Sequence, residues 1–256
     1  MLDIQEPSFT RRIALEHLSD LGLSHFIFGS EIKEDRAAWF AGILDSKSAA
    51  IMHRIDKVND ANYRFESLEL ECNLFESSDL AGLASKLSGT VGIDLTSLEH
   101  RVWAPLIRAF AAAGSDFMVL YAEPGEYRSS SELPGRIYDL SLSLGIEPLP
   151  GFAKIGRRPD NEGYFAPLLG FEGARLRHIF DQEEVEAGNT SPVIGVPGFR
   201  LEYSMSAYLS NQALLEEGHM GQRVEFARAS CPFEAYRALQ RIHARSEGKY
   251  LRIAPI

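Results

Sequence analysis

Residues 90–121 read TVGIDLTSLEHRVWAPLIRAFAAAGSDFMVLY, and the architecture can be worked out from this segment. Two apolar runs, over 90–94 and 116–121, predict strands. The amphipathic segment between them predicts a helix that ends at Gly114. A strand, a helix and a strand with such short joints form a parallel pair with a right-handed crossover.

The start of this helix carries its own signal. The spacing of Thr96 and Glu99 is typical of a capping box, so the helix is expected to begin there. Pro105 lies inside the predicted helix, where it removes a backbone hydrogen bond. This predicts either a kink or a later start.

The same alternation of short apolar runs and amphipathic segments continues on both sides. Nothing follows the last predicted strand, so this strand is either an antiparallel edge or the end of a fragment. The other predicted strands are 25–28, 49–55, 63–70, 164–169, 192–196, 223–227 and 251–254. The other predicted helices are 10–21, 35–44, 80–87, 174–180, 203–215 and 232–245.

Residues 123–160 interrupt the alternation with repeated prolines and glycines. Such composition is typical of a connecting segment or a long functional loop. We therefore predict an α/β fold of two Rossmann-like layered halves with mostly parallel sheets. The predicted divisions are an N-terminal half over 1–128, an irregular connection over 129–160 and a C-terminal half over 161–256.

Composition excludes several classes of partner. The chain has 256 residues and a formal net charge of −10, from 26 Lys and Arg residues against 36 Asp and Glu residues. Non-specific binding to DNA or RNA gains its affinity by neutralising phosphates, which an acidic chain does poorly. An anionic membrane surface is disfavoured for the same reason. We expect neither nucleic acid nor a membrane as the main partner.

Cysteine usage and the N-terminus point to one compartment. Cys72 and Cys231 do not make a disulfide framework, and each lies in or beside an apolar run, as small buried residues do. Residues 1–6 are acidic and contain no apolar signal region. Both observations predict a cytoplasmic location.

Candidate ligand-binding residues follow the predicted strands. Ligands of open parallel sheets bind beyond the carboxyl ends of the strands, where helix N-termini attract anions. Gly29 and Ser30 follow the first predicted strand, and Asp94 and Thr96 lie at the end of the fourth. Asp94 either binds a ribose hydroxyl or Mg²⁺, or belongs to the helix cap together with Thr96.

The second half offers a glycine turn. Gly170 and Gly173 bracket the sequence GFEG, and Arg175 follows two residues later. Glycines let a backbone approach a ligand closely, and a guanidinium binds phosphate through two parallel hydrogen bonds. The spacing matches neither a dinucleotide fingerprint nor a P-loop. The alternative is a tight strand–helix turn with Arg175 and Arg177 on a solvated helix face.

Three carboxylates are candidates for catalysis. Glu31, Asp94 and Glu123 each lie at or just after the end of a predicted strand. If those strands are neighbours, the three groups form a site for Mg²⁺ or for acid–base catalysis, with one pKa raised by the others. The seven histidines and two cysteines show no metal-ligand spacing, and the chain has no Gly-x-Ser-x-Gly motif. No metal site or α/β-hydrolase triad is therefore assigned.

A basic stripe marks the last predicted helix. Arg237, Arg241 and Arg245 recur at four-residue spacing, which is usually a solvated face. The alternative is a docking surface for an acidic partner or for a polyphosphate. The acidic loop 181–186 of a second copy would fit such a surface, which predicts self-association.

Together these features predict a cytoplasmic α/β protein that binds a nucleotide or another phosphorylated small molecule in the strand-end crevice. Two alternatives remain open. A metal-assisted hydrolase or transferase acting on a nucleotide requires Glu31, Asp94 and Glu123 to lie within reach of one another. A non-catalytic interaction module would instead use the basic stripe and the acidic loop.

Overall fold

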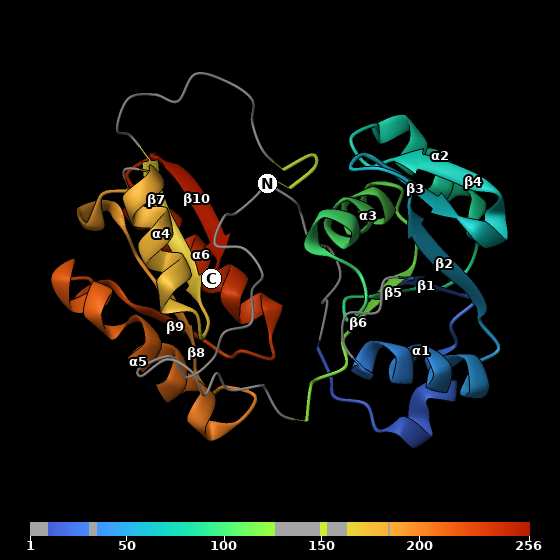
Figure 1. The fold of residues 1–256 in the computed structure, drawn as a ribbon, viewed down its shortest axis with the longest axis horizontal. Helices are drawn as coiled ribbons and strands as arrows, with labels where there is room; N and C mark the ends of the chain where they lie inside the picture. The colour runs from blue at the N-terminus through green and yellow to red at the C-terminus, as the bar shows by residue number, and fades with distance from the viewer. Residues whose placement is uncertain (1–9, 31–34, 126–148, 153–162, 184) are drawn as a thin grey trace. The chain divides into compact units, whose positions relative to one another are not determined.

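The structure is a computed structural model that describes residues 10–30, 35–125, 149–152, 163–183 and 185–256. The described residues form two compact units, each built on its own sheet (Figure 1). Among the described residues, the first unit comprises residues 12–30, 35–125 and 149–152, and the second comprises residues 10–11 and those from 163 onward. Both sheets are mostly or wholly parallel and alternate with helices, which confirms the predicted α/β class.

Six strands form the sheet of the first unit, in the order β4-β3-β2-β1-β5-β6. The neighbours β2, β1, β5 and β6 run parallel, and β3 and β4 add an antiparallel pair beside β2. The strands are β1 (His25–Gly29), β2 (Ile51–Lys57), β3 (Asn62–Phe65), β4 (Leu70–Asn73), β5 (Val91–Asp94) and β6 (Phe117–Leu120).

Helices cover both faces of this sheet (Figure 1). Successive residues of a strand face opposite sides, so Phe26 packs in one layer and Ile27 in the other. The first layer contains α1 (Asp35–Lys47) and the 3-10 helix η1 (Leu15–Leu21). The second contains α2 (Ser77–Lys86) and α3 (His100–Ala112), and we call this side of the sheet the α2–α3 face.

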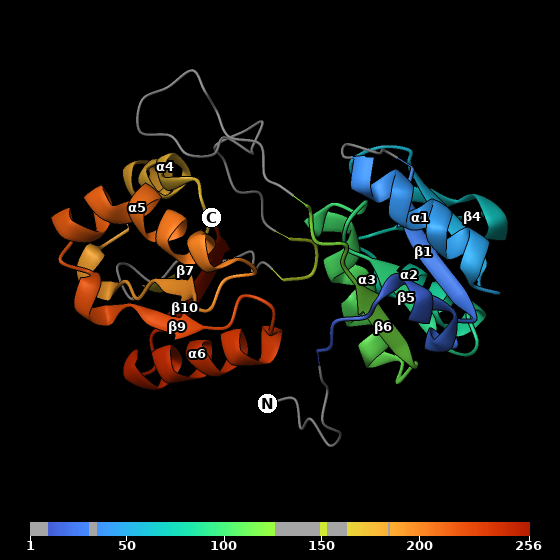
Figure 2. The same ribbon diagram turned by 90° about the horizontal axis from the view of Figure 1, so that it is seen from below.

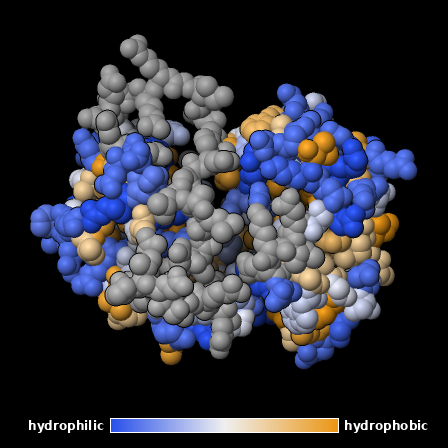
Figure 3. Space-filling model, viewed as in Figure 1, coloured by the Kyte–Doolittle hydropathy of each residue, from blue (hydrophilic) through white to orange (hydrophobic). Residues whose placement is uncertain are grey.

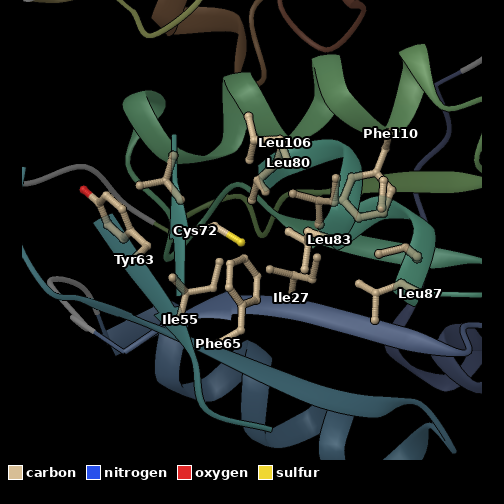
Figure 4. Packing of buried hydrophobic residues seen from close by; sticks show 14 of the residues in the cluster. Ile27, Ile55, Tyr63, Phe65, Cys72, Leu80, Leu83, Leu87, Leu106 and Phe110 are labelled. Carbon is tan, nitrogen blue, oxygen red and sulfur yellow. The ribbon is translucent and has the colours of Figure 1, made fainter. Parts of the chain in front are cut away.

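The larger hydrophobic core of the first unit lies on the α2–α3 face (Figure 4). Phe65, Leu83 and Phe110 are fully buried in it. Cys72 belongs to the same cluster, as predicted, and burial raises the pKa of its thiol to about 11. The thiol is therefore protonated at neutral pH, which makes it a packing residue and a poor nucleophile.

The single strand predicted over 63–70 is wrong. The chain forms β3, a 3-10 turn η2 (Glu66–Leu68) and β4 instead. Glu69 has a φ of 48°, a left-handed conformation in which a strand cannot continue. Alternation of apolar residues does not reveal such a turn, because Phe65 and Leu70 on either side of it both belong to strands.

The capping box predicted at Thr96 is also wrong. The helix α3 begins at His100, with Glu99 as its N-cap residue. A later start was one of the two outcomes expected from Pro105, which nevertheless lies inside the helix. The hydroxyl of Thr96 is used by a different part of the chain, described below.

Four strands form the sheet of the second unit, in the order β10-β7-β8-β9. All neighbours run parallel, so β10 is a parallel edge strand, and of the two alternatives left open by the sequence the antiparallel edge is wrong. The strands are β7 (Gly163–Leu169), β8 (Val193–Gly195), β9 (Glu225–Ala227) and β10 (Tyr250–Pro255).

Helices again cover both faces of this second sheet. Figure 2 shows α4 (Gly173–Glu183) and α5 (Leu201–Glu217) on one side and α6 (Pro232–Arg245) on the other. Pro232 occupies the first turn of α6, where its missing N–H costs nothing, and this position was predicted from the sequence. Two short 3-10 helices, η3 (Ala187–Asn189) and η4 (Gly221–Arg223), complete the unit.

Residues 149–152 pack with the first unit. The guanidinium of Arg108 donates to the carbonyl oxygen of Gly151 and lies 5.6 Å from the ring centroid of Phe152. The sequence places these residues in the connecting segment 129–160. The other positions of that segment lie outside the described residues.

The surface mixes polar and apolar side chains. Figure 3 shows hydrophobic residues at several places among hydrophilic ones on the visible face. Large apolar side chains that are exposed include Trp39, Phe75 and Phe226. None of the helices in the described ranges combines the length and the apolar character that crossing a bilayer requires.

The close approach between Gly29 and the backbone of Ser97 can be tested by measuring the stability of a substituted protein. A Cβ atom at this position would lie 2.6 Å from the carbonyl oxygen of Ser97, whereas one at Gly82 in α2 would meet nothing within 4 Å. We expect Gly29→Ala to lower the free energy of unfolding by about 1–3 kcal/mol through overpacking. Gly82→Ala should raise it by about 0.5–1 kcal/mol, because alanine favours a helix interior. Urea unfolding of both variants measures this, and equal effects would contradict the proposed contact.

Candidate functional site

The strand order of the first unit contains a topological switch point. From β1 the chain moves outward to β2, and it later returns to place β5 on the opposite side of β1. The carboxyl ends of β1 and β5 therefore flank the place where the order reverses. In open α/β sheets, ligands bind outside the strands at such a point.

The buried carboxylate of Asp94 organises the loop at this point. It accepts hydrogen bonds from the backbone N–H groups of Thr96 (2.8 Å) and Ser97 (3.2 Å) and from the hydroxyl of Ser97 (2.5 Å). Burial raises the pKa of Asp94 above its usual value, and these hydrogen bonds oppose the rise. We call Asp94, Thr96 and Ser97 the strand-end clasp.

The strand-end clasp connects three strands. The backbone N–H of Gly29, the last residue of β1, donates to the hydroxyl oxygen of Ser97 at 2.8 Å. The backbone N–H of Ala122, which follows β6, donates to the hydroxyl oxygen of Thr96 at 3.0 Å. The predicted site residues Gly29, Asp94 and Thr96 are thus brought together, but they bond to one another and to the backbone.

A small pocket lies beside the strand-end clasp. Its volume is about 30 Å³, enough for a water-sized group and far below the roughly 300–1,000 Å³ of pockets that enclose a whole small molecule. A larger ligand would place one polar group inside and lie mostly outside. The lining residues are Gly29, Ser30, Ile55, Lys57, Tyr63, Ser97, Leu98, Glu99 and Val102.

Tyr63 supplies the most informative polar group of this pocket. Only 4% of its surface is exposed, and its hydroxyl has no hydrogen-bond partner among the described residues. Figure 4 shows that the hydroxyl points away from the hydrophobic cluster. The pKa of Tyr63 is raised, chiefly by burial, so the hydroxyl stays protonated and can donate a hydrogen bond. A buried donor without an acceptor costs free energy, which a bound oxygen atom would recover.

The charges around Tyr63 are mixed. Lys57 pairs with Tyr63 across β2 and β3, and its ammonium contacts the carboxylate of Asp60 at 2.9 Å. Glu99 caps α3, so the pocket lies at the first turn of a helix, whose dipole favours an anion. Lys57, Tyr63 and the backbone N–H groups of the first turn of α3 can donate hydrogen bonds to a ligand oxygen. The carboxylate of Glu99 can accept one from a ligand hydroxyl.

The glycine turn of the second unit is explained by packing. A Cβ atom at Gly170 would lie 2.3 Å from the carbonyl oxygen of Ile256, and one at Gly173 would lie 1.7 Å from that of Ser210. Arg175 lies 3.7 Å from the carboxylate of Glu172. The tight strand–helix turn weighed in the sequence accounts for both glycines, and phosphate binding by this turn stays a prediction.

The three candidate carboxylates are not seen together. Glu31 lies outside the described residues, Asp94 is committed to the strand-end clasp, and Glu123 is exposed after β6. Within the described ranges, no group of three or more His, Cys, Asp or Glu residues is arranged to hold a metal ion. The Mg²⁺ expectation and the hydrolase alternative stay predictions.

The basic stripe is partly neutralised within its own unit. The carboxylate of Glu225 on β9 binds Arg241 at 2.8 Å and Arg245 at 2.7 Å. These bonds attach α6 to an edge strand and reduce the positive charge offered to an acidic partner. Self-association through this stripe stays a prediction.

Sequence reasoning did not find Lys57, Tyr63 or Glu99. Lys57 lies in the polar turn that follows Ile55, and Tyr63 is the first residue of the predicted strand 63–70. A predicted β2–β3 hairpin would have indicated these residues, because antiparallel pairing of β2 and β3 places Tyr63 opposite Lys57. That pairing depends on a turn at 58–61 that the sequence marks only as polar.

Removal of the Asp94 carboxylate tests the strand-end clasp. Asp94→Ala leaves the partly buried N–H groups of Thr96 and Ser97 without an acceptor, and each unsatisfied group costs about 1–3 kcal/mol when it is kept from water. We expect the free energy of unfolding to fall by about 3 kcal/mol or more in urea. Asp116→Ala is the matched control, because its exposed carboxylate accepts one hydroxyl bond, from Thr90. A loss no larger than in this control would refute the clasp.

Two tyrosines give a second contrast. Tyr63→Phe removes a hydroxyl without a partner and should leave the free energy of unfolding unchanged or raise it. Tyr164→Phe removes a buried hydroxyl that lies 2.9 Å from that of Ser191, and it should cost about 0.5–1.5 kcal/mol. Thermal unfolding of both variants measures the difference. A larger loss for Tyr63→Phe would show that its hydroxyl is already satisfied.

No family model matches this chain, no curated protein matches it, and no solved structure matches it.

Proposed function

We propose that the first unit binds a nucleotide or another phosphorylated small molecule at the carboxyl edge of its sheet. The observation that carries the proposal is the buried hydroxyl of Tyr63, which lines a pocket beside the switch point and has no partner among the described residues. A phosphate oxygen is an acceptor that fits this donor. The pocket takes one such oxygen, and the rest of the ligand lies outside it.

Neighbouring groups support an anion in this place. Lys57 lines the pocket, and its ammonium contacts the carboxylate of Asp60 at 2.9 Å. The first turn of α3 adds the positive end of a helix dipole. The N–H of Gly29 is already used by Ser97, so the phosphate is expected on the side of β2 and β3. Glu99 is then placed to accept from a ligand hydroxyl, such as that of a ribose.

Thermal unfolding with ligands tests this proposal. AMP, ADP, ribose 5-phosphate and inorganic phosphate are compared with adenosine, each with and without Mg²⁺. A compound present at 100 times its Kd stabilises the fold by about 2.7 kcal/mol, which corresponds to a Tm increase of about 5 °C or more. At least one phosphorylated compound should produce this shift, and adenosine should not.

Variants locate the binding. Tyr63→Phe and Lys57→Gln should each reduce the shift, because each removes a donor to the phosphate. Lys249→Gln is the control, since Lys249 lies in the second unit, where its ammonium contacts Asn189 at 2.9 Å. The proposal fails if no phosphorylated compound shifts the wild type. It also fails if both pocket variants retain the full shift.

A further inference from the structure

Three side chains outside the pocket form a continuous line of hydrogen bonds. The hydroxyl oxygen of Ser67 lies 2.6 Å from Nδ1 of His53, and Nε2 of His53 lies 2.9 Å from Nδ1 of His25. They come from η2, β2 and β1, and we call them the Ser–His–His line. It shares no residue with the pocket or the strand-end clasp, so it does not depend on the proposed function.

The pairing of the strands explains why these residues meet. β1 and β2 run parallel with His25 opposite Ile51, so His53 follows two residues later on the same face. β2 and β3 run antiparallel with Ile55 opposite Phe65, and this register continued into η2 brings Ser67 beside His53. The line therefore depends on long-range pairing, and the spacing of the histidines in the sequence gives no sign of it.

The three side chains of the line differ in burial. His53 is 1% exposed, His25 is half-buried, and Ser67 is exposed at the surface end. Burial, followed by the neighbouring His25, lowers the pKa of His53 to about 4. His53 is therefore neutral near pH 7 and offers one lone pair and one N–H. It can accept from Ser67 at Nδ1 and donate from Nε2 to His25.

We propose that Ser67 is a nucleophile for acyl transfer, with His53 as its general base and His25 as the positioning residue that accepts from His53. A nucleophile, a base and a third group that orients the base are the recurring parts of covalent catalysis, whatever the fold. The substrate class is a carboxylic ester. Ile51 is 57% exposed on the same face of β2 as His53, and it offers an apolar contact to the acyl group.

The reaction balances with water as the only co-reactant. Ser67 Oγ bonds to the ester carbonyl carbon while its proton passes to Nδ1 of His53, and the Nε2–H of His53 stays hydrogen-bonded to Nδ1 of His25. The C–O bond of the ester then breaks, and the alcohol leaves with the proton returned from Nδ1 of His53. Water attacks the acyl-serine, releases the carboxylic acid and restores the Ser67 hydroxyl.

Labelling of the full chain with an alkyl fluorophosphonate tests the proposal. This probe bonds to an activated serine through phosphorus and releases fluoride, with the serine proton taken by the base. We expect one adduct per chain on the folded wild type, located at Ser67 by peptide mass spectrometry, and none on Ser67→Ala. His53→Gln should slow labelling at least about 100-fold, the usual contribution of a general base.

Controls separate activation from exposure and from misfolding. Ser85→Ala should label at the wild-type rate, because the exposed Ser85 hydroxyl donates only to the carbonyl oxygen of Gly82 in the part of the chain described. His25→Gln, at a half-buried position, decides the matter if circular dichroism shows that His53→Gln is unfolded, and it should also slow labelling. The proposal is overturned if the folded wild type gains no adduct at Ser67. It is equally overturned if the folded histidine variants label at the wild-type rate.

Discussion

The hydrogen bonds of the Asp94 carboxylate hold the carboxyl edge of the six-stranded sheet together. A buried carboxylate is costly unless donors surround it, and here two backbone N–H groups and a hydroxyl do so. Through Ser97 and Thr96 the same group fixes the ends of β1 and β6. This arrangement requires Gly29 to lie close to Ser97. A side chain at position 29 would meet the carbonyl oxygen of Ser97 and push the end of β1 away from the loop after β5.

The strand-end clasp also determines where a ligand has room. In dinucleotide-binding folds, the backbone after the first strand is free to approach a phosphate. Here the N–H of Gly29 is already bonded to Ser97, so that position is closed. The remaining donors lie one strand further out, where the β2–β3 hairpin brings Tyr63 and Lys57 to the first turn of α3. The antiparallel addition to a parallel sheet thus shifts the candidate site toward the hairpin.

The sequence was sufficient where local pattern and tertiary environment agree. The strands β5 and β6 and the helix α6 with Pro232 at its start were found because apolar runs and capping residues mark them. It was insufficient where one residue overrides the pattern, as Glu69 does between β3 and β4.

The position of Asp94 at the end of a strand was predictable, but its partners were not. Thr96 looked like a helix cap and instead bonds to the backbone after β6. Contacts of this kind join residues far apart in the chain, and no local spacing records them. The same limit hid Tyr63 and the Ser–His–His line.

The register between β2 and β3 positions both the pocket donors and the Ser–His–His line. Because side chains alternate along a strand, His53, Ile55 and Lys57 all face the α2–α3 side. Their counterparts across the hairpin are Ser67, Phe65 and Tyr63. The outer pairs supply the Ser–His–His line and the pocket donors, and the middle pair belongs to the hydrophobic core.

A slip of one residue would turn all of these side chains to the opposite face, and the core pair would lose its packing against α2 and α3. The burial of Ile55 and Phe65 therefore fixes the register, and with it the two polar groupings on either side. Neither grouping needs a stabilising role of its own to be maintained. Polar side chains held in place by a neighbouring core are free to be selected for binding or chemistry, which is the physical reason to look for function at both ends of this hairpin.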